Sequence, residues 1–182
     1  MATGYTGPVT LDHALTGDTL LHIDGLTYAV LDPARLDFAA AQPARKTASI
    51  RVRTATAGET IVTRPDAIEE ASFFATGGEL IFINDLPDGR EDAYLPRDAS
   101  GRPNGDEVLA GAYEAAGDGH YRPVATPCPV LHQVIDRPVV MLDVWGPGQH
   151  QFLTLGASLK LESGRVTGID RHAFALTWTV EA

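Results

Sequence analysis

The sequence predicts a mainly β, or α+β, protein made of antiparallel hairpin units with few short helices. Gly and Pro are numerous, at 18 and 12 of 182 residues, and they separate short strand-like runs. A glycine-delimited hairpin pattern recurs up to three times along the chain. No run has the long amphipathic pattern that a parallel α/β sheet needs. We therefore expect two or three pseudo-repeats around a shared core.

The pattern is clearest in two segments, 17–25 and 156–164. In both, a Gly is followed by Leu three residues later and by a second Gly eight residues later. The second Gly belongs to an Asp-Gly or Ser-Gly pair, which is typical of a hairpin turn. A further short strand follows in each segment and ends at an aspartate, Asp32 or Asp170.

The two aspartates are predicted to be the N-caps of short helical turns. An Asp side chain at this position accepts a hydrogen bond from a free backbone N–H of the first turn. Four residues after Asp32 and Asp170 come Leu36 and Phe174, which are placed to pack the turn against its hairpin. For the first copy we expect a helix over 32–41.

A longer middle copy begins at 73–80, whose Phe, Gly and Leu have the same spacing as in 152–159. It continues through a strand and a turn into a turn-rich insertion at 96–105. We expect Asp106 to cap a helix that extends to Ala116.

The remaining apolar runs predict further strands. They lie at 48–54, 60–63, 130–135, 139–144 and 175–180. Linkers are predicted at 39–44, which contains one Pro, and at 116–129, which is rich in Pro and Gly. The units are then 1–44, 45–119 with the insertion 96–105, and 120–182, joined in one compact domain.

The middle copy resembles the PGDYG family. The resemblance lies in Phe73, the run Gly77-Gly78-Glu79-Leu80, Asp88-Gly89, Leu109 and Tyr113-Glu114, and the segments 156–178 and 17–36 are similar. Only Gly17-Asp18 keeps the Gly-Asp pair of the family. The resemblance implies a small β-rich unit of bacterial or phage origin, and it transfers no activity or catalytic residue.

The charge of the chain argues against polyanionic partners. Asp and Glu exceed Lys and Arg by 24 to 14, which gives a formal net charge of −10. A negative surface repels nucleic acids and anionic membranes, so we expect neither as a partner. The basic cluster of Arg45, Lys46, Arg51 and Arg53 is interpreted as a solvated strand face.

The single cysteine, Cys128, excludes an internal disulfide and suits a reducing compartment. The first residues lack the basic start and apolar core of a signal peptide. No apolar run approaches the length of a membrane-spanning helix. We therefore expect a cytoplasmic protein.

A metal site, a cysteine nucleophile and a calcium loop are the three candidate chemistries, and a structural interpretation is favoured for each. No two histidines have a tight ligand spacing, so we assign no metal and no cofactor. Cys128 would need a neighbouring base to be a nucleophile, and a small buried residue is the favoured interpretation. The oxygen-rich stretch 84–92 lacks the order of a calcium loop and is interpreted as a solvated hairpin turn.

Two loops combine aromatic and polar groups that could stack on and hydrogen-bond a ring or a sugar. One is 145–152 and the other is 120–122. The candidate ligand-binding residues are Trp145, Gln149, His150, His120, Tyr121 and Arg122.

The preferred function is a non-catalytic binding or interaction protein of unknown ligand, a bacterial or phage accessory protein as the resemblance implies. The partner would be a protein or a small molecule, and self-association into a homo-oligomer stays open. The alternative is a small hydrolase-type enzyme that uses polar groups of the Trp145–His150 loop or of the insertion 96–105. A deep pocket with at least two converging titratable groups would favour an enzyme. An exposed aromatic patch or an interface between copies would favour a binding module.

Overall fold

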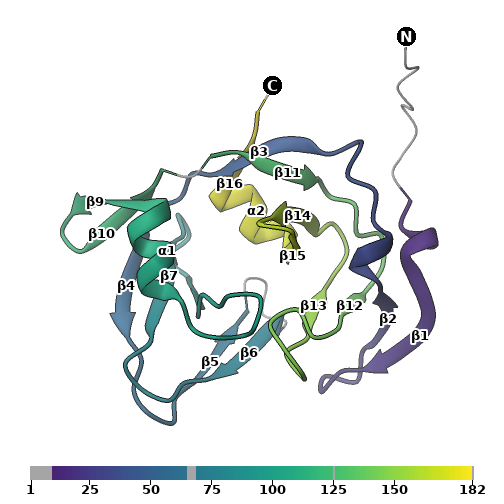
Figure 1. Cartoon of the computed structure of the whole chain (residues 1–182), viewed down its shortest axis with the longest axis horizontal. Coiled ribbons are helices and arrows are strands. Elements are labelled where there is room, and N and C mark those ends of the chain that lie inside the picture. The colour runs from purple at the N-terminus through teal and green to yellow at the C-terminus, as the bar shows by residue number, and fades with distance from the viewer. Residues whose placement is uncertain (1–9, 65–68, 125, 182) are drawn as a thin grey trace.

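The computed structural model describes residues 10–64, 69–124 and 126–181, and it is mainly β, as predicted. Its sheets are arranged as a ring around helix α2 (Arg171–Thr177) and the hairpin of strands β14 and β15 (Figure 1). A second α-helix, α1 (Gly105–Ala112), lies on the opposite side of the ring from strands β1 and β2. Two three-residue 3-10 helices, η1 (Asp12–Ala14) and η2 (Pro33–Arg35), flank the first hairpin.

The strands are short, with three to seven residues each. In chain order they are β1 (Leu15–Leu21), β2 (Thr27–Leu31), β3 (Gln42–Lys46), β4 (Ile50–Thr54), β5 (Thr60–Thr63), β6 (Ala71–Phe74), β7 (Leu80–Asp85), β8 (Glu91–Tyr94), β9 (Tyr113–Gly117), β10 (His120–Pro123), β11 (Cys128–Leu131), β12 (Val139–Met141), β13 (Gln151–Leu153), β14 (Ser158–Glu162), β15 (Arg165–Ile169) and β16 (Trp178–Val180).

The strands form three larger sheets and one separate hairpin. The orders are β1-β2-β12-β13, β8-β7-β4-β10-β9 and β15-β14-β11-β3-β16, with β5 and β6 as the hairpin. The pairs are antiparallel except for β2 and β12, which run parallel. Short connections between neighbouring strands explain why antiparallel pairing dominates.

The predicted hairpin turns are confirmed at both ends of the chain. Gly25 turns β1 into β2 and Gly164 turns β14 into β15, each with a φ of 75°. That backbone conformation is easily adopted by glycine and rarely by other residues. Whether the hairpins arose by internal duplication stays a prediction.

The predicted N-caps are also confirmed. The carboxylate of Asp32 accepts the N–H two residues on at 3.0 Å, and that of Asp170 does so at 2.7 Å. Phe174 is 5% exposed and packs with Ala44 and Val130 on the third sheet. Leu36 is half-buried and packs against the core below the first sheet.

Three predicted helix and strand boundaries were wrong. Helix α1 begins after Asn104, so Asp106 lies in its first turn, and the chain turns into strand β9 at Tyr113. Over 32–41 only the three residues of η2 are helical. Residues 175–177 belong to α2, because Phe174 and Thr177 bury one face of the helix.

The predicted linkers contain strands. Residues 39–44 include the start of β3, and 116–129 includes β10 and the start of β11. Pro43 and Pro129 suggested irregular chain, but they face each other across the β3–β11 pair. Strands 130–135 and 139–144 were predicted too long, and the structure has β11 ending at Leu131 and β12 at Met141.

The largest apolar core combines side chains of the first sheet with those of β11 and β14 of the third sheet. Its fully buried side chains include Leu31, Val139, Met141 and Leu159. Burying these side chains supplies a large part of the stabilisation, at about 1.5–3 kcal/mol each. Within the described ranges, no helix is long and apolar enough to cross a membrane.

Candidate functional site

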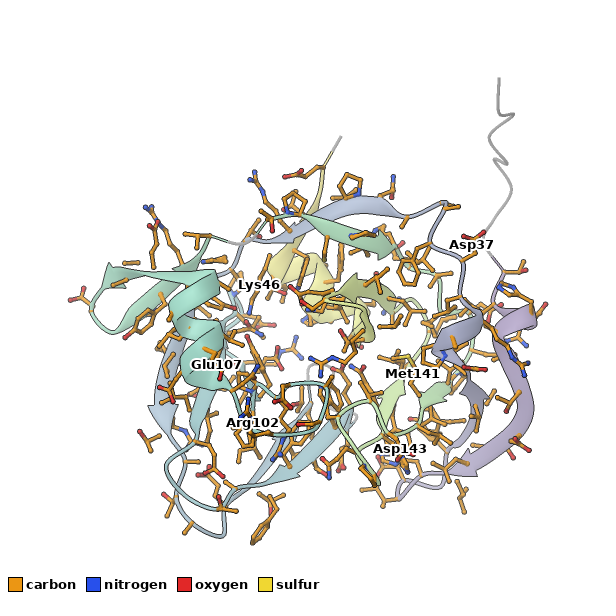
Figure 2. All side chains as sticks on the ribbon, viewed as in Figure 1. Asp37, Lys46, Arg102, Glu107, Met141 and Asp143 are labelled. Atoms are coloured by element: carbon orange, nitrogen blue, oxygen red, sulfur yellow. The ribbon has the colours of Figure 1, made fainter. Side chains whose placement is uncertain are left out.

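A pocket of about 560 Å³ lies inside the ring of sheets. Its wall combines residues of all three sheets, of both α-helices and of the segment 96–104. Pockets of roughly 300–1,000 Å³ are typical of small-molecule sites. Lys46, at the end of β3, lies between α1 and α2 in the view of Figure 2.

The amine of Lys46 is held by two tyrosines. Its Nζ donates a hydrogen bond to the hydroxyl of Tyr94 at 2.9 Å and to that of Tyr113 at 3.0 Å. The two hydroxyl oxygens are 3.3 Å apart, and both rings pack edge-on against Phe82. Tyr94 and Tyr113 belong to β8 and β9, the two edges of one sheet, so this sheet curls until its edges meet over Lys46.

Burial lowers the pKa of Lys46 from 10.5 to about 7, and the charge of Lys160 acts in the same direction. Asp92 and Glu162 oppose this shift but do not cancel it. Burial also raises the pKa of Tyr113 to about 12 and that of Tyr94 well above its ordinary value. The phenols therefore stay neutral, and they hold the amine without supplying a counter-charge.

Asn84 and Asp92 form a buried polar pair on the neighbouring strands β7 and β8. The amide of Asn84 donates to the Asp92 carboxylate at 2.6 Å, and both residues are less than a tenth exposed. Burial raises the pKa of Asp92. The turn between them is a hairpin turn, as predicted, but its two ends lie in the pocket wall.

Glu70 supplies a second buried carboxyl. The side-chain Nε2 of Gln151 donates to it and also to the carbonyl of Gly168 at 3.0 Å, while the Oε1 of Gln151 accepts the backbone N–H of Gly168 at 2.8 Å. Burial raises the pKa of Glu70 to about 8, despite the opposing hydrogen bond from Gln151. Glu70 is therefore largely protonated at neutral pH.

Arg97 and Arg165 place two guanidinium groups in the pocket wall. Arg97 donates to the carbonyl of Gly101 and lies over the ring of Phe73, 4.8 Å from its centroid. Arg165 donates to the carbonyl of Arg97 at 3.0 Å. Among the described residues neither has a carboxylate at ion-pair distance, whereas nine other arginines do.

Lys160 stands in contrast to Lys46. Its amine pairs with the carboxylate of Glu162 at 2.6 Å and lies 5.2 Å from the centroid of the Trp178 ring. The chain contains only these two lysines, and both line the pocket.

Buried polar atoms without a hydrogen-bond partner gather around the pocket. Nine described residues carry such an atom, and six of them line the pocket: Asn84, Asp92, Arg97, Asn104, Arg165 and Thr167. An unsatisfied buried polar group costs about 1–3 kcal/mol of stability. Their concentration here is more typical of a ligand site than of a core built for stability.

Of the predicted ligand-binding residues, the structure places Trp145 in the pocket wall, where it packs edge-on against Phe73 at 5.3 Å. The neighbouring Gln149 and His150 do not line the pocket. The Nδ1 atom of His150 accepts the backbone N–H of Asp143 at 3.2 Å.

The second predicted loop, 120–122, begins β10, and none of its three residues lines the pocket. His120 contacts the carboxylate of Asp85 at 2.7 Å, and the exposed Arg122 pairs with Glu114. Tyr121 lies opposite Ile50 on β4. The structure therefore does not bring the two loops together at one site, and their ligand-binding role stays a prediction.

The Trp145 loop is joined to the insertion 96–105. A Cβ on Gly101 would lie only 1.9 Å from the carbonyl oxygen of Trp145, and Gly101 has a φ of +82°. A glycine is therefore required where the two backbones meet. This contact links the segment that carries Arg97 to the loop that carries Trp145.

The interpretation of the basic cluster was wrong for Lys46. Arg45, Arg51 and Arg53 are exposed and pair with carboxylates, but Lys46 turns into the pocket. Cys128 is buried, and burial raises the pKa of its thiol, which disfavours the thiolate. In the described part of the chain, no three His, Cys, Asp or Glu side chains are grouped to hold a metal ion.

Sequence reasoning missed nearly all of the pocket residues. One signal was available: Ala44 and Lys46 are two residues apart in β3 and therefore share one face of the strand. Ala44 on that face is fully buried. Comparison with known proteins adds no assignment, because no family model, curated protein or solved structure matches this chain.

Proposed function

We propose that this protein binds a small organic anion in the central pocket. The observation that carries the proposal is the pair Arg97 and Arg165, which line the pocket without a carboxylate of the described residues at ion-pair distance. Both arginines are half-buried, and each has one buried guanidinium nitrogen without a hydrogen-bond partner among the described residues. A guanidinium group suits carboxylate and phosphate oxygens.

The rest of the wall supports a ligand with both polar and apolar parts. Phe73, Trp145 and Trp178 offer aromatic faces. Asn84, Asp92 and Thr167 have buried polar atoms that lack hydrogen-bond partners among the residues that the structure describes. Such a mixture of aromatic faces and a few convergent polar groups is typical of small-molecule sites.

The test is a thermal-shift and calorimetric screen with inorganic phosphate and succinate, with neutral succinamide as the comparison. A ligand at 100 times its Kd stabilises the folded state by about 2.7 kcal/mol. In a chain of this size that raises the Tm by roughly 2–4 °C per kcal/mol. We expect a shift with the anions and none with succinamide.

Arg97→Met and Arg165→Met should each raise the Kd for the anion at least about tenfold, since a charge-assisted hydrogen bond contributes about 1.5–3 kcal/mol. The matched control is Arg137→Met, because Arg137 is exposed and pairs with Asp136 and Asp12. Anion binding that persists unchanged in both pocket variants would overturn the proposal.

A catalytic role is a second proposal, favoured by the convergence of Lys46, Glu70 and Asp92 in one pocket. Two of these groups, Lys46 and Glu70, have pKa values near neutral, as general acids and bases do. A hydrolase of this kind would use pocket residues rather than His150. Turnover of nitrophenyl esters or phosphates that Lys46→Met abolishes would support it, and equal turnover in both proteins would contradict it.

A further inference from the structure

We propose that Lys46 forms an imine with an aldehyde or ketone ligand that carries an anionic group. The inference rests on the proposed anion-binding role of the pocket and names the ligand class. It is carried by the placement of one amine in the pocket wall and by its two tyrosine acceptors, with no carboxylate of the described residues at ion-pair distance from it.

The two tyrosines fix the amine without pairing its charge. Both hydroxyl oxygens accept a hydrogen bond from Nζ, at 2.9 and 3.0 Å. The centroids of the two rings lie 5.0 and 5.6 Å from Nζ. Tyr94 and Tyr113 come from opposite edges of a curled sheet, so their separation is set by the fold. The amine of Lys46 is thus oriented in advance of ligand binding.

The other titratable groups around Lys46 act in opposite directions. Lys160 disfavours its charged form, while Asp92 and Glu162 favour it. Glu162 is already paired with Lys160, and burial raises the pKa of Asp92. With a pKa of about 7, roughly half of the Lys46 amine is neutral at pH 7, compared with well under 1% for an ordinary lysine.

The chemical step needs no oxidant, reductant or metal. The Nζ lone pair forms a bond to the carbonyl carbon, and the π electron pair of the C=O bond moves to oxygen. Two protons leave the amine nitrogen and depart with that oxygen as water. The product is a C=N bond between Lys46 and the ligand, and hydrolysis reverses the step. A desolvated lysine is a well-suited nucleophile for this reaction.

The arginines restrict the ligand class. Arg97 and Arg165 offer positive charge on the same pocket wall, and the charge of Glu162 acts on both Lys46 and Arg165. A ligand with a carboxylate or phosphate would therefore be held by the arginines while its carbonyl group reacts with Lys46.

The experiment is reductive labelling of the folded protein with glyoxylate and cyanoborohydride, followed by peptide mass mapping. Acetaldehyde, which replaces the carboxylate by a methyl group, is the matched probe. The two lysines allow an internal comparison, since each gives its own adduct. We expect Lys46 to be labelled at least about tenfold faster than Lys160 at pH 7.

Equal labelling of both lysines, or labelling of Lys46 only after unfolding, would overturn the imine proposal. The main readout uses the unaltered protein, so it does not depend on a variant that folds. Lys46→Met should remove the fast-forming adduct and leave the slow adduct of Lys160. In the folded protein, a half-maximal rate near pH 7 is expected for Lys46.

The two proposals fail in different ways. If Lys46 is selectively labelled by acetaldehyde and glyoxylate alike, the imine chemistry stands and the anion site is wrong. If phosphate and succinate bind but the labelling is not selective, the anion site stands and the imine proposal is wrong. Loss of the preference for glyoxylate over acetaldehyde in Arg97→Met would support both proposals, because it would mean that Arg97 binds the carboxylate of the aldehyde that reacts with Lys46.

Discussion

The first sheet and the central pocket bury their residues for different purposes. Strand β12 of the first sheet consists of Val139, Val140 and Met141, all fully buried and apolar. The pocket wall instead contains buried atoms of carboxyl, amide and guanidinium groups, several without a hydrogen-bond partner among the described residues. Apolar burial stabilises the fold, whereas such polar burial costs stability unless it serves another role. The comparison therefore places apolar stabilisation in the first sheet and unsatisfied polar groups in the pocket.

The largest effect is expected from the apolar side. Met141→Ala should destabilise the fold by about 2–5 kcal/mol, because it leaves a cavity in the core. Chemical denaturation would measure the loss. The neighbouring Leu142, which is 42% exposed, gives the control, and Leu142→Ala should change stability by less than about 0.5 kcal/mol. Similar losses of stability in both variants would contradict the conclusion that the buried apolar side chains of the first sheet stabilise the fold.

On the polar side, substitution should stabilise. The pKa of Lys46 falls from 10.5 to about 7 in the fold, so the folded state disfavours the charged amine. This cost is full below about pH 7 and disappears as the pH rises from 7 to 10.5. Lys46→Met should therefore raise the Tm at about pH 6 and have less effect at about pH 10. A lower Tm at both pH values would contradict the assignment.

Glu70 should show the opposite pH dependence. Its pKa rises from 4.5 to about 8, so ionisation costs nothing below pH 4.5 and the full amount above pH 8. Glu70→Gln replaces the protonated carboxyl and should raise the Tm at about pH 9, with little change at about pH 4.5. Thermal unfolding across this range would measure it, and a uniform gain at all pH values would contradict the buried acid.

The smallest effects are expected at the two N-cap aspartates, which occupy equivalent positions but differ in burial and in the number of N–H groups they accept. Asp170 is 7% exposed and accepts two backbone N–H groups of α2, whereas Asp32 accepts one N–H of the short η2. Asp170→Ala should cost about 1 kcal/mol, and Asp32→Ala should cost less. Denaturant unfolding of both variants would measure the order, and Asp170→Asn should recover much of the loss.

The fold class, the hairpin turns and the caps were predictable because local sequence determines them. Asp32, Asp170, Gly25 and Gly164 act within a few residues of their own positions. The end of α1 at Ala112 was not predictable in this way, because Tyr113 leaves the helix to join β10 and meet Lys46.

The pocket was not predictable because it is assembled by contacts between distant segments. Lys46 and Tyr113 are 67 residues apart, and Glu70 and Gln151 are 81 apart. Lys46 follows an arginine that is exposed, and only the strand alternation of β3 separates their two faces. Pro43 had concealed that strand by suggesting a linker.

The parallel pair of β2 and β12 has a consequence for how the chain reaches this structure. Ala29 lies opposite Val139, so the pairing joins the first part of the chain to the last third. Closing so large a loop costs conformational entropy before the favourable contacts between the strands form. Folds rich in such contacts therefore form slowly. We expect β12 to add to the first hairpin late, so a nascent chain exposes the apolar face of β2 until most of its sequence has been synthesised.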